Sequence, residues 1–194
     1  MSKIPEALWN IRAAMLLFVI DVNILGFDVV PDFVGWLCLL GAIDHLEGTV
    51  PSIERIRTFG RVLFWYEILA IVLNYVGGEL PFLPVVLPIV SIFLFCIRIY
   101  FMYIILTAAA DAATQEGGEA DTVKKLCRSR NWVLIAELLV NVSAAIKGET
   151  VISGMLWVPT VLYFIFYIGC ILRLTFLKEE VEAFRKAKEE PQEG

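Results

Sequence analysis

The amino-acid sequence predicts an all-α polytopic membrane protein with about six transmembrane helices, arranged as three hairpins with both termini in the cytoplasm. Three observations lead to this class. First, 59% of the 194 residues are hydrophobic and only 19% are charged, against roughly a quarter charged in an ordinary soluble domain. Second, the mean hydropathy is +0.76, and a soluble chain this small could not cover so much apolar surface. Third, the apolar residues fall into runs separated by alternately short and longer links.

The same composition excludes several other classes of protein. A disordered chain and a disulfide-rich secreted domain would both be far less apolar. The net charge of −5 argues against a nucleic-acid partner, which would need a basic surface.

Six apolar runs are expected to cross the bilayer. They cover residues 7–27, 31–46, 61–76, 81–110, 131–146 and 151–177, and they form the hairpins 7–46, 61–110 and 131–177 within one transmembrane domain at 1–178. A helix needs about 20 residues to cross roughly 30 Å of hydrocarbon, so the second, third and fifth runs need local thinning of the bilayer. The fourth run is too long, and its inner end is expected to project from the membrane or bend along it. The charged residues of 179–194 predict a cytoplasmic helix that continues the sixth run and ends in a frayed tail.

Basic residues set the expected orientation. Thirteen lysines and arginines flank the inner ends of the runs, and the opposite links hold only Lys147. This asymmetry is a strong positive-inside signal and predicts that both termini are cytoplasmic. No small-residue cleavage site follows the first run, which is therefore expected to remain in the mature protein.

Two further arginines, Arg98 and Arg173, lie inside apolar runs. Counted from the outer ends of their helices, they lie at depths of about 26 and 33 Å. We expect both to lie near the inner interface and to extend their charged groups towards it. The alternative is a buried ion pair.

Each odd-numbered run carries one acidic residue, namely Asp21, Glu67 and Glu137. An ionisable group in a membrane helix costs roughly 2.5–3.5 kcal/mol on insertion scales and usually faces protein or water. Glu137 and Asn141 are four positions apart, and Glu67 and Asn74 are seven apart, so each pair shares a helix face. Three carboxylates and two amides are therefore expected around one cavity, as a cation or polar-solute site or as a proton relay. The alternative is that the two glutamates extend to flanking arginines, or pair with them, for stability alone.

Two of the hairpins share a spacing that suggests an internal repeat. Glu67 lies twelve residues before Glu79, and Glu137 lies twelve residues before Glu149. Parallel repeats are a known way to build transporters. The alternative is coincidence, because interfacial tryptophans and loop acids recur in any polytopic protein.

The densest group of polar residues joins the first two runs, and it contains Asp21, Asn23, Asp28 and Asp32. Gly26 can end the first helix, and Pro31 suits the first turn of the second. Asp32 would then complement the dipole of that helix, so capping explains it without a ligand. Capping does not explain the other three side chains, and broken helix ends near a membrane are also where ions and substrates bind.

The segment from residue 28 to residue 41 resembles a known pattern. It reads Asp28-Val-Val-Pro31-Asp32-Phe33-Val-Gly35-Trp36-Leu-Cys-Leu-Leu-Gly41. Small, largely uncharacterised bacterial multi-pass membrane proteins carry a similar Asp-x-x-Pro-Asp-Phe-x-Gly-Trp hairpin. The resemblance covers about the first quarter of the chain, and it implies a location in the bacterial inner membrane without implying an activity.

Enzymatic catalysis is not expected, and neither is a metal or a cofactor. His45 is the only histidine, and the four cysteines have no paired spacing. Walker and Gly-x-Ser-x-Gly motifs are absent as well.

The leading interpretation is a small transporter, or a membrane-embedded solute-binding subunit, that uses the intramembrane acids and amides. Six spans in under 200 residues also resemble in size the substrate-binding component of bacterial energy-coupling-factor vitamin importers. One alternative is an oligomeric ion or proton channel lined by Asp21, Glu67 and Glu137. Another is a non-transporting membrane sensor or assembly partner. The expected partners are the lipid bilayer, a small solute, cation or proton, and a second copy of the chain or a partner membrane subunit.

Overall fold

The computed structural model describes residues 3–19, 23–24, 27–28, 32–50, 53–76, 83–145 and 157–189. In this part of the chain there are six α-helices and one short antiparallel ladder, which confirms the all-α class. The helices are α1 (Ile4–Val19), α2 (Asp32–Leu46), α3 (Ile53–Val76), α4 (Leu83–Gln115), α5 (Ala120–Ala145) and α7 (Trp157–Glu189). The ladder joins β1 (Asn23–Ile24) to β2 (Phe27–Asp28).

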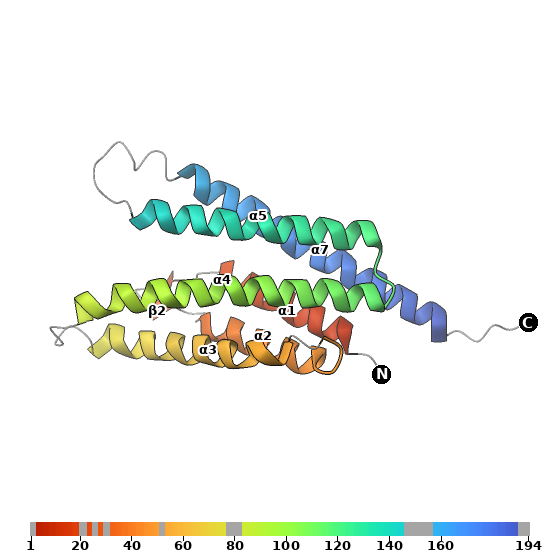
Figure 1. The fold of residues 1–194 in the computed structure, drawn as a ribbon, viewed down its shortest axis with the longest axis horizontal. Helices are drawn as coiled ribbons and strands as arrows, with labels where there is room; N and C mark the ends of the chain where they lie inside the picture. The colour runs from red at the N-terminus through yellow and green to blue at the C-terminus, as the bar shows by residue number, and fades with distance from the viewer. Residues whose placement is uncertain are drawn as a thin grey trace, which may run out of the picture.

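The helices form a closed ring (Figure 1). Each helix contacts the next one along the chain, and α7 returns to pack against α1. Consecutive helices run antiparallel as the pairs α1–α2, α3–α4 and α5–α7. We call the end of the bundle at which α1 begins and α7 finishes the terminal end, and the opposite end, at which α4 begins, the far end.

The hydrophobic core fills the terminal half of the ring. Its largest fully buried side chain is Trp36 of α2, whose ring centre lies 5.2 Å from that of Phe18 on α1 and 5.4 Å from that of Phe101 on α4. The other helices contribute fully buried side chains of their own, among them Ile56, Leu126 and Leu174. In the far half, by contrast, the side chains at 64–72, 89–93, 138–142 and 158–166 are all half-buried or exposed. Close packing therefore holds the bundle together at the terminal end only, as far as the described residues reach.

Large apolar side chains cover the outside of the far half. Trp65, Ile89 and Phe93 are 64%, 67% and 66% exposed, whereas soluble monomers rarely expose large contiguous apolar patches. Two helical stretches, Ile89–Gln115 and Val158–Glu189, are long and apolar enough to cross a membrane, and Phe33–Leu46 is a shorter apolar helix.

The first helix is shorter than the apolar run that contains it. The run extends to residue 27, but α1 ends at Val19 and the strand β1 lies within the rest of the run. Three residues of the run disfavour a helix there. Asp21 and Asn23 have side chains that compete for backbone hydrogen bonds, and Gly26 favours a turn.

Two helices extend beyond the expected spans at the terminal end. Helix α3 begins at Ile53 rather than at residue 61, and α5 begins at Ala120 rather than at residue 131. The added turns carry lysines and arginines, which favour helices although they are not apolar. Hydropathy alone therefore leaves them out.

Helices α2 and α3 are joined at the terminal end by an ionic clamp. The guanidinium of Arg57 donates hydrogen bonds to Asp44 and to Glu47, both at 2.7 Å. The hydrogen bond to Glu47 is the main reason why the pKa of Arg57 is raised above its usual value. Gly48 completes the turn with a φ of 80°, which other residues rarely adopt.

The charged end of α7 docks on the start of α5. The Glu180 carboxylate accepts hydrogen bonds from the backbone N–H of Glu119 at 2.9 Å and from the Thr122 hydroxyl at 2.6 Å. Since the first N–H groups of a helix lack partners within it, Glu180 acts as a cap for α5 supplied from another helix. The α4–α5 turn, with Gly117 at a φ of 83°, packs closely beside Phe184 of the same α7 segment.

Candidate functional site

A buried ion pair joins α4 to α5 inside the ring. The Nε atom of Arg98 lies 3.3 Å from Oε1 of Glu137, and the two side chains are 28% and 10% exposed. The guanidinium also lies over the Phe18 ring of α1, with 5.3 Å between its carbon and the ring centre. Arg98 therefore connects three helices.

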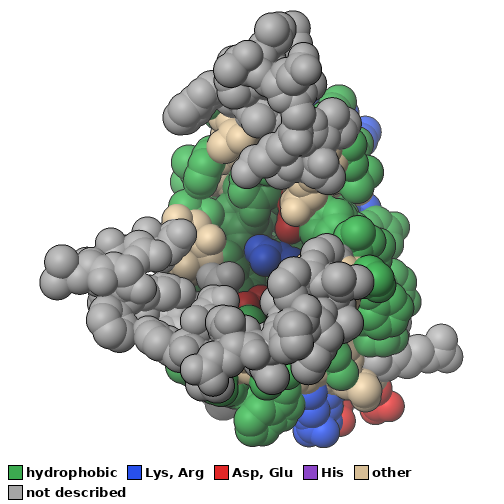
Figure 2. All heavy atoms as spheres, turned by 90° about the vertical axis from the view of Figure 1, so that its left-hand side faces the viewer, with side chains coloured by type: hydrophobic (Ala, Val, Ile, Leu, Met, Phe, Trp, Pro, Cys, Tyr) green, Lys and Arg blue, Asp and Glu red, His purple; other side chains and the backbone are tan. Residues whose placement is uncertain are grey.

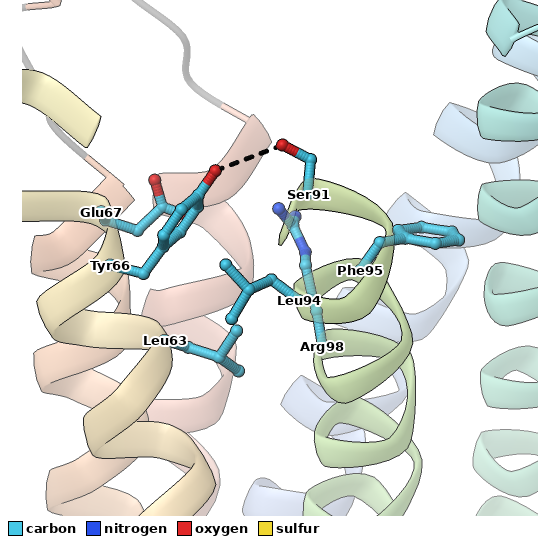
Figure 3. A pocket seen from close by; sticks show the side chains of 7 residues that line it. All are labelled: Leu63, Tyr66, Glu67, Ser91, Leu94, Phe95 and Arg98. Carbon is cyan, nitrogen blue, oxygen red and sulfur yellow. Dashed lines mark hydrogen bonds between the residues drawn. The ribbon is translucent and has the colours of Figure 1, made fainter. Parts of the chain in front are cut away.

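The direction of the Arg98 side chain differs from the expectation. In Figure 3 the side chain runs from its own turn of α4 towards Ser91, and so towards the far end. This direction follows from helix geometry, because side chains lean towards the N-terminus of their helix. The expected extension of Arg98 towards the terminal end is therefore wrong, and the alternative, an ion pair, is what the structure contains.

A cavity of about 150 Å³ lies between α3 and α4 (Figure 3). It is lined by Leu63, Tyr66, Glu67, Ser91, Leu94, Phe95 and Arg98. Tyr66 and Glu67 project from α3 towards α4, and the Tyr66 hydroxyl shares a hydrogen bond of 3.4 Å with Ser91. The cavity thus has a carboxylate, a guanidinium and two hydroxyl groups set in apolar walls.

A second cavity, of about 190 Å³, lies among α4, α5 and α7. It is lined by Phe95, Arg98, Glu137, Val140, Asn141 and Tyr163. Asn141 donates a hydrogen bond of 2.9 Å to the backbone carbonyl of Glu137, one turn earlier on the same face of α5. This shared face is the one that the four-residue spacing predicts.

The two cavities share Arg98 and Phe95 and have matching chemistry. Each contains one carboxylate, one tyrosine and one uncharged polar side chain, Ser91 in the first cavity and Asn141 in the second. Figure 2 looks into the far end, where basic atoms lie in a hollow with acidic atoms beside them. Glu67 and Glu137, the first members of the two twelve-residue spacings, therefore lie in cavities on either side of Arg98.

Three of the eight expected site residues line these cavities, namely Glu67, Glu137 and Asn141. The other five lie outside the described residues, wholly in the case of Asp21 and in their side chains for Asn23, Asp28, Asp32 and Asn74. In backbone terms, Asn23 pairs with Asp28 in the ladder and Asp32 is the first residue of α2. Where the sequence predicts one shared cavity, the described carboxylates line two adjoining ones.

Several lining residues are not among those expected from the sequence. Tyr66, Ser91 and Tyr163 gave no signal, because tyrosine and serine are common in apolar helices. Tyr167 lies beside Tyr163, with ring centres 5.3 Å apart, and is 2% exposed. Its hydroxyl has no hydrogen-bond partner within the described part of the chain.

The site combines charged, hydroxyl and amide side chains around two cavities. Among the described residues, no group of three or more histidine, cysteine, aspartate or glutamate side chains could hold a metal ion. The charged and hydroxyl groups instead surround spaces large enough for a small molecule. They can hold a polar solute by ion pairing and hydrogen bonding.

Comparison of the chain with protein-family models, with curated proteins and with solved structures gave no match. The resemblance of residues 28–41 to a bacterial hairpin pattern therefore stays a prediction.

Proposed function

We propose that the chain is a small membrane-embedded transporter, or the solute-binding subunit of one, and that it binds a small polar solute beside Arg98. One observation carries the proposal. The far half of the ring contains cavities with charged walls, whereas the terminal half is a close-packed apolar core. A binding site that is open towards one side only is what a transporter needs in one of its two access states.

The membrane location is supported by the outer surface. Two helices have the length and apolarity to cross a bilayer, and large side chains such as Trp65 and Phe93 are two-thirds exposed. In this proposal all six helices cross the bacterial inner membrane, with the terminal end in the cytoplasm. The position of Arg57, Lys125 and Lys178 near the terminal end supports that orientation, because cytoplasmic flanks are enriched in basic residues.

Binding explains the ionisable groups better than stability does. A buried ion pair is often no more stabilising than well-packed apolar side chains of similar volume, and ionisable residues within membranes mark substrate and ion pathways. Here the pair also borders two cavities, so the charges lie where a solute can reach them.

An open channel receives less support than a transporter. A channel lined by Glu67 and Glu137 has to continue through the terminal half of the ring. There Trp36, Phe101 and Ile105 are fully buried and pack in the apolar core. Those side chains close the path below the ion pair in this structure.

The proposal is tested by the accessibility of the first cavity. In a background whose four cysteines are replaced by alanine, Ser91→Cys is reconstituted in vesicles and treated with an impermeant maleimide. The thiol should react from the far side only, because Ser91 lines the first cavity, which lies in the far half of the ring. Ile105→Cys, in the core, and Trp65→Cys, on the lipid-facing surface, should both stay unlabelled, since maleimides react with thiolates in water.

A panel of small cationic, anionic, zwitterionic and neutral solutes is then added before the reagent. Protection of Ser91→Cys by any one class supports solute binding. An unreactive Ser91→Cys in the folded protein contradicts the proposal and favours a dry sensor or assembly partner. Labelling that no solute slows would also contradict it.

A further inference from the structure

We propose that Arg130 forms a binding site for a phosphate group at the junction of α4 and α5. The inference goes beyond the proposed function, because none of the side chains that contact Arg130 lines either of the two cavities beside Arg98. It uses only the membrane location and the orientation proposed above.

Arg130 is a buried cation whose described partners are all neutral. It is 8% exposed, and its guanidinium donates hydrogen bonds to Thr107 of α4 and to Asn131 of α5. It also lies over the ring of Tyr103, with 4.2 Å between its carbon and the ring centre. Within the part of the chain that the structure describes, no ion pair joins Arg130 to a carboxylate. Because a buried charge is costly unless an opposite charge compensates it, this site favours an anion.

The side chain of Asn131 marks the position of a bound phosphate oxygen. Its amide oxygen accepts hydrogen bonds from Nε and Nη2 of Arg130, at 3.0 and 2.9 Å. These two donors form one edge of the planar guanidinium, and such an edge can bind phosphate through two parallel hydrogen bonds. Asn131 is exposed, and exposed side chains change rotamer within nanoseconds. A phosphate can therefore replace the neutral amide and bring the negative charge that the amide lacks.

The other two partners hold the guanidinium in place before an anion arrives. The Thr107 hydroxyl donates a hydrogen bond of 2.6 Å to the backbone carbonyl of Tyr103, one turn earlier on α4. Since its only proton is used there, its oxygen is left to accept the hydrogen bond from Nη1 of Arg130. Preorganisation of this kind lowers the entropic cost of binding.

The site lies at the level expected for lipid headgroups. Arg130 lies ten residues after Ala120, the start of α5, and so about 15 Å along the helix from its terminal end. Trp132 is 48% exposed and Tyr103 is 42% exposed, and both residue types are enriched at membrane interfaces. Basic sites between transmembrane helices on the cytoplasmic side bind anionic headgroups. An anionic phospholipid and free inorganic phosphate are thus the two sources of the group.

The test has one arm for each source, and both use the purified full-length chain in detergent. In the first arm, native mass spectrometry measures the binding of phosphatidylglycerol and of diacylglycerol with the same acyl chains. Wild-type protein should bind phosphatidylglycerol at least tenfold more tightly, because diacylglycerol lacks the phosphate. In the second arm, equilibrium dialysis measures the binding of radiolabelled inorganic phosphate. Binding in the first arm alone assigns the site to a phospholipid, and binding in the second arm assigns it to free phosphate.

Three variants separate this site from a general effect of positive charge. Arg130→Gln should weaken binding at least tenfold. Arg128→Gln is the matched control, since it removes the same charge from an exposed position on the same helix, and it should leave binding unchanged. Asn131→Ala should bind at least as tightly as wild-type protein, because it frees the edge of the guanidinium that the amide occupies.

The inference is overturned if phosphatidylglycerol binds no more tightly than diacylglycerol and inorganic phosphate does not bind. Normal binding by folded Arg130→Gln, or an equal loss in Arg128→Gln, overturns it as well. If Arg130→Gln does not fold, the two lipids on wild-type protein and the Asn131→Ala variant give the answer. The labelling of Ser91→Cys tests the proposed function separately, so either proposal can fail without the other.

Discussion

Replacing Arg98 with methionine should destabilise the protein far more than replacing Glu137 with glutamine. Methionine keeps an apolar stem but leaves the carboxylate of Glu137, which is only 10% exposed, without the guanidinium beside it. Removing one partner of a buried ion pair costs about 3–5 kcal/mol. For a chain of this size, each kcal/mol shifts Tm by about 2–4 °C, so Arg98→Met should lower Tm by roughly 6–20 °C.

Glu137→Gln should cost much less, because the amide is neutral and because Arg98 still lines the first cavity together with the carboxylate of Glu67. A loss of about 1 kcal/mol is expected, typical of one hydrogen bond. The double variant Arg98→Met/Glu137→Gln should be more stable than Arg98→Met alone, since it no longer buries an unbalanced Glu137 carboxylate. Thermal denaturation of the purified variants in one detergent measures all three. Equal losses for the two single variants, adding up in the double variant, would refute this account of the ion pair.

Other substitutions test the packing, the capping and the orientation. Gly35→Leu should lower Tm by an amount that corresponds to about 1–3 kcal/mol, because an added Cβ would lie 2.6 Å from an aromatic carbon of α1. Gly169→Ala meets nothing within 4 Å in the middle of α7 and should stabilise the protein by about 0.5–1 kcal/mol. An unchanged Tm in both would show that these glycines are not packed as described. Glu180→Ala removes both hydrogen bonds to the start of α5 and should cost about 1–3 kcal/mol, measured against the exposed neighbour Glu179→Ala. To test the orientation, Gln115→Cys should react with an impermeant thiol reagent from the cytoplasmic side only, and Gly78→Cys should react from the opposite side only. The reverse result would contradict the proposed topology.

The order of the helices could be predicted from the sequence, whereas several of their ends could not. Apolar runs predict where a chain prefers lipid, and α2 begins and ends within a residue of its run. Helices α3 and α5 begin before their runs, since the backbone hydrogen bonds of a helix do not depend on apolar side chains. For the first run, the helix is shorter than the apolar run predicts. The run stays apolar beyond Val19, but Asn23 and Ile24 form a strand.

The candidate site could be predicted only in part. An acid in an apolar run stands out in any sequence, so Glu67 and Glu137 are predictable as cavity-lining residues, and helical spacing adds Asn141. The depth of Arg98 gave its distance along the helix axis but not the direction of its side chain, which leans towards the start of α4. Tyr66 and Ser91 come from different helices, and only the packing of α3 against α4 brings their hydroxyls within 3.4 Å.

The way the helices pack indicates which parts must move if the chain transports a solute. The pairs α1–α2 and α5–α7 have the most extensive interfaces in the ring, whereas α4 makes only small contacts with α1, α2 and α7 across it. If the proposed transporter opens its terminal half, we expect the less extensive interfaces of α4 to separate first, including the contact between Trp36 and Phe101. Arg98 lies one turn of α4 before Phe101 and contacts both Phe18 on α1 and Glu137 on α5. In the proposed transporter, a solute bound beside Arg98 would contact the same helix, which would couple binding to a change of access.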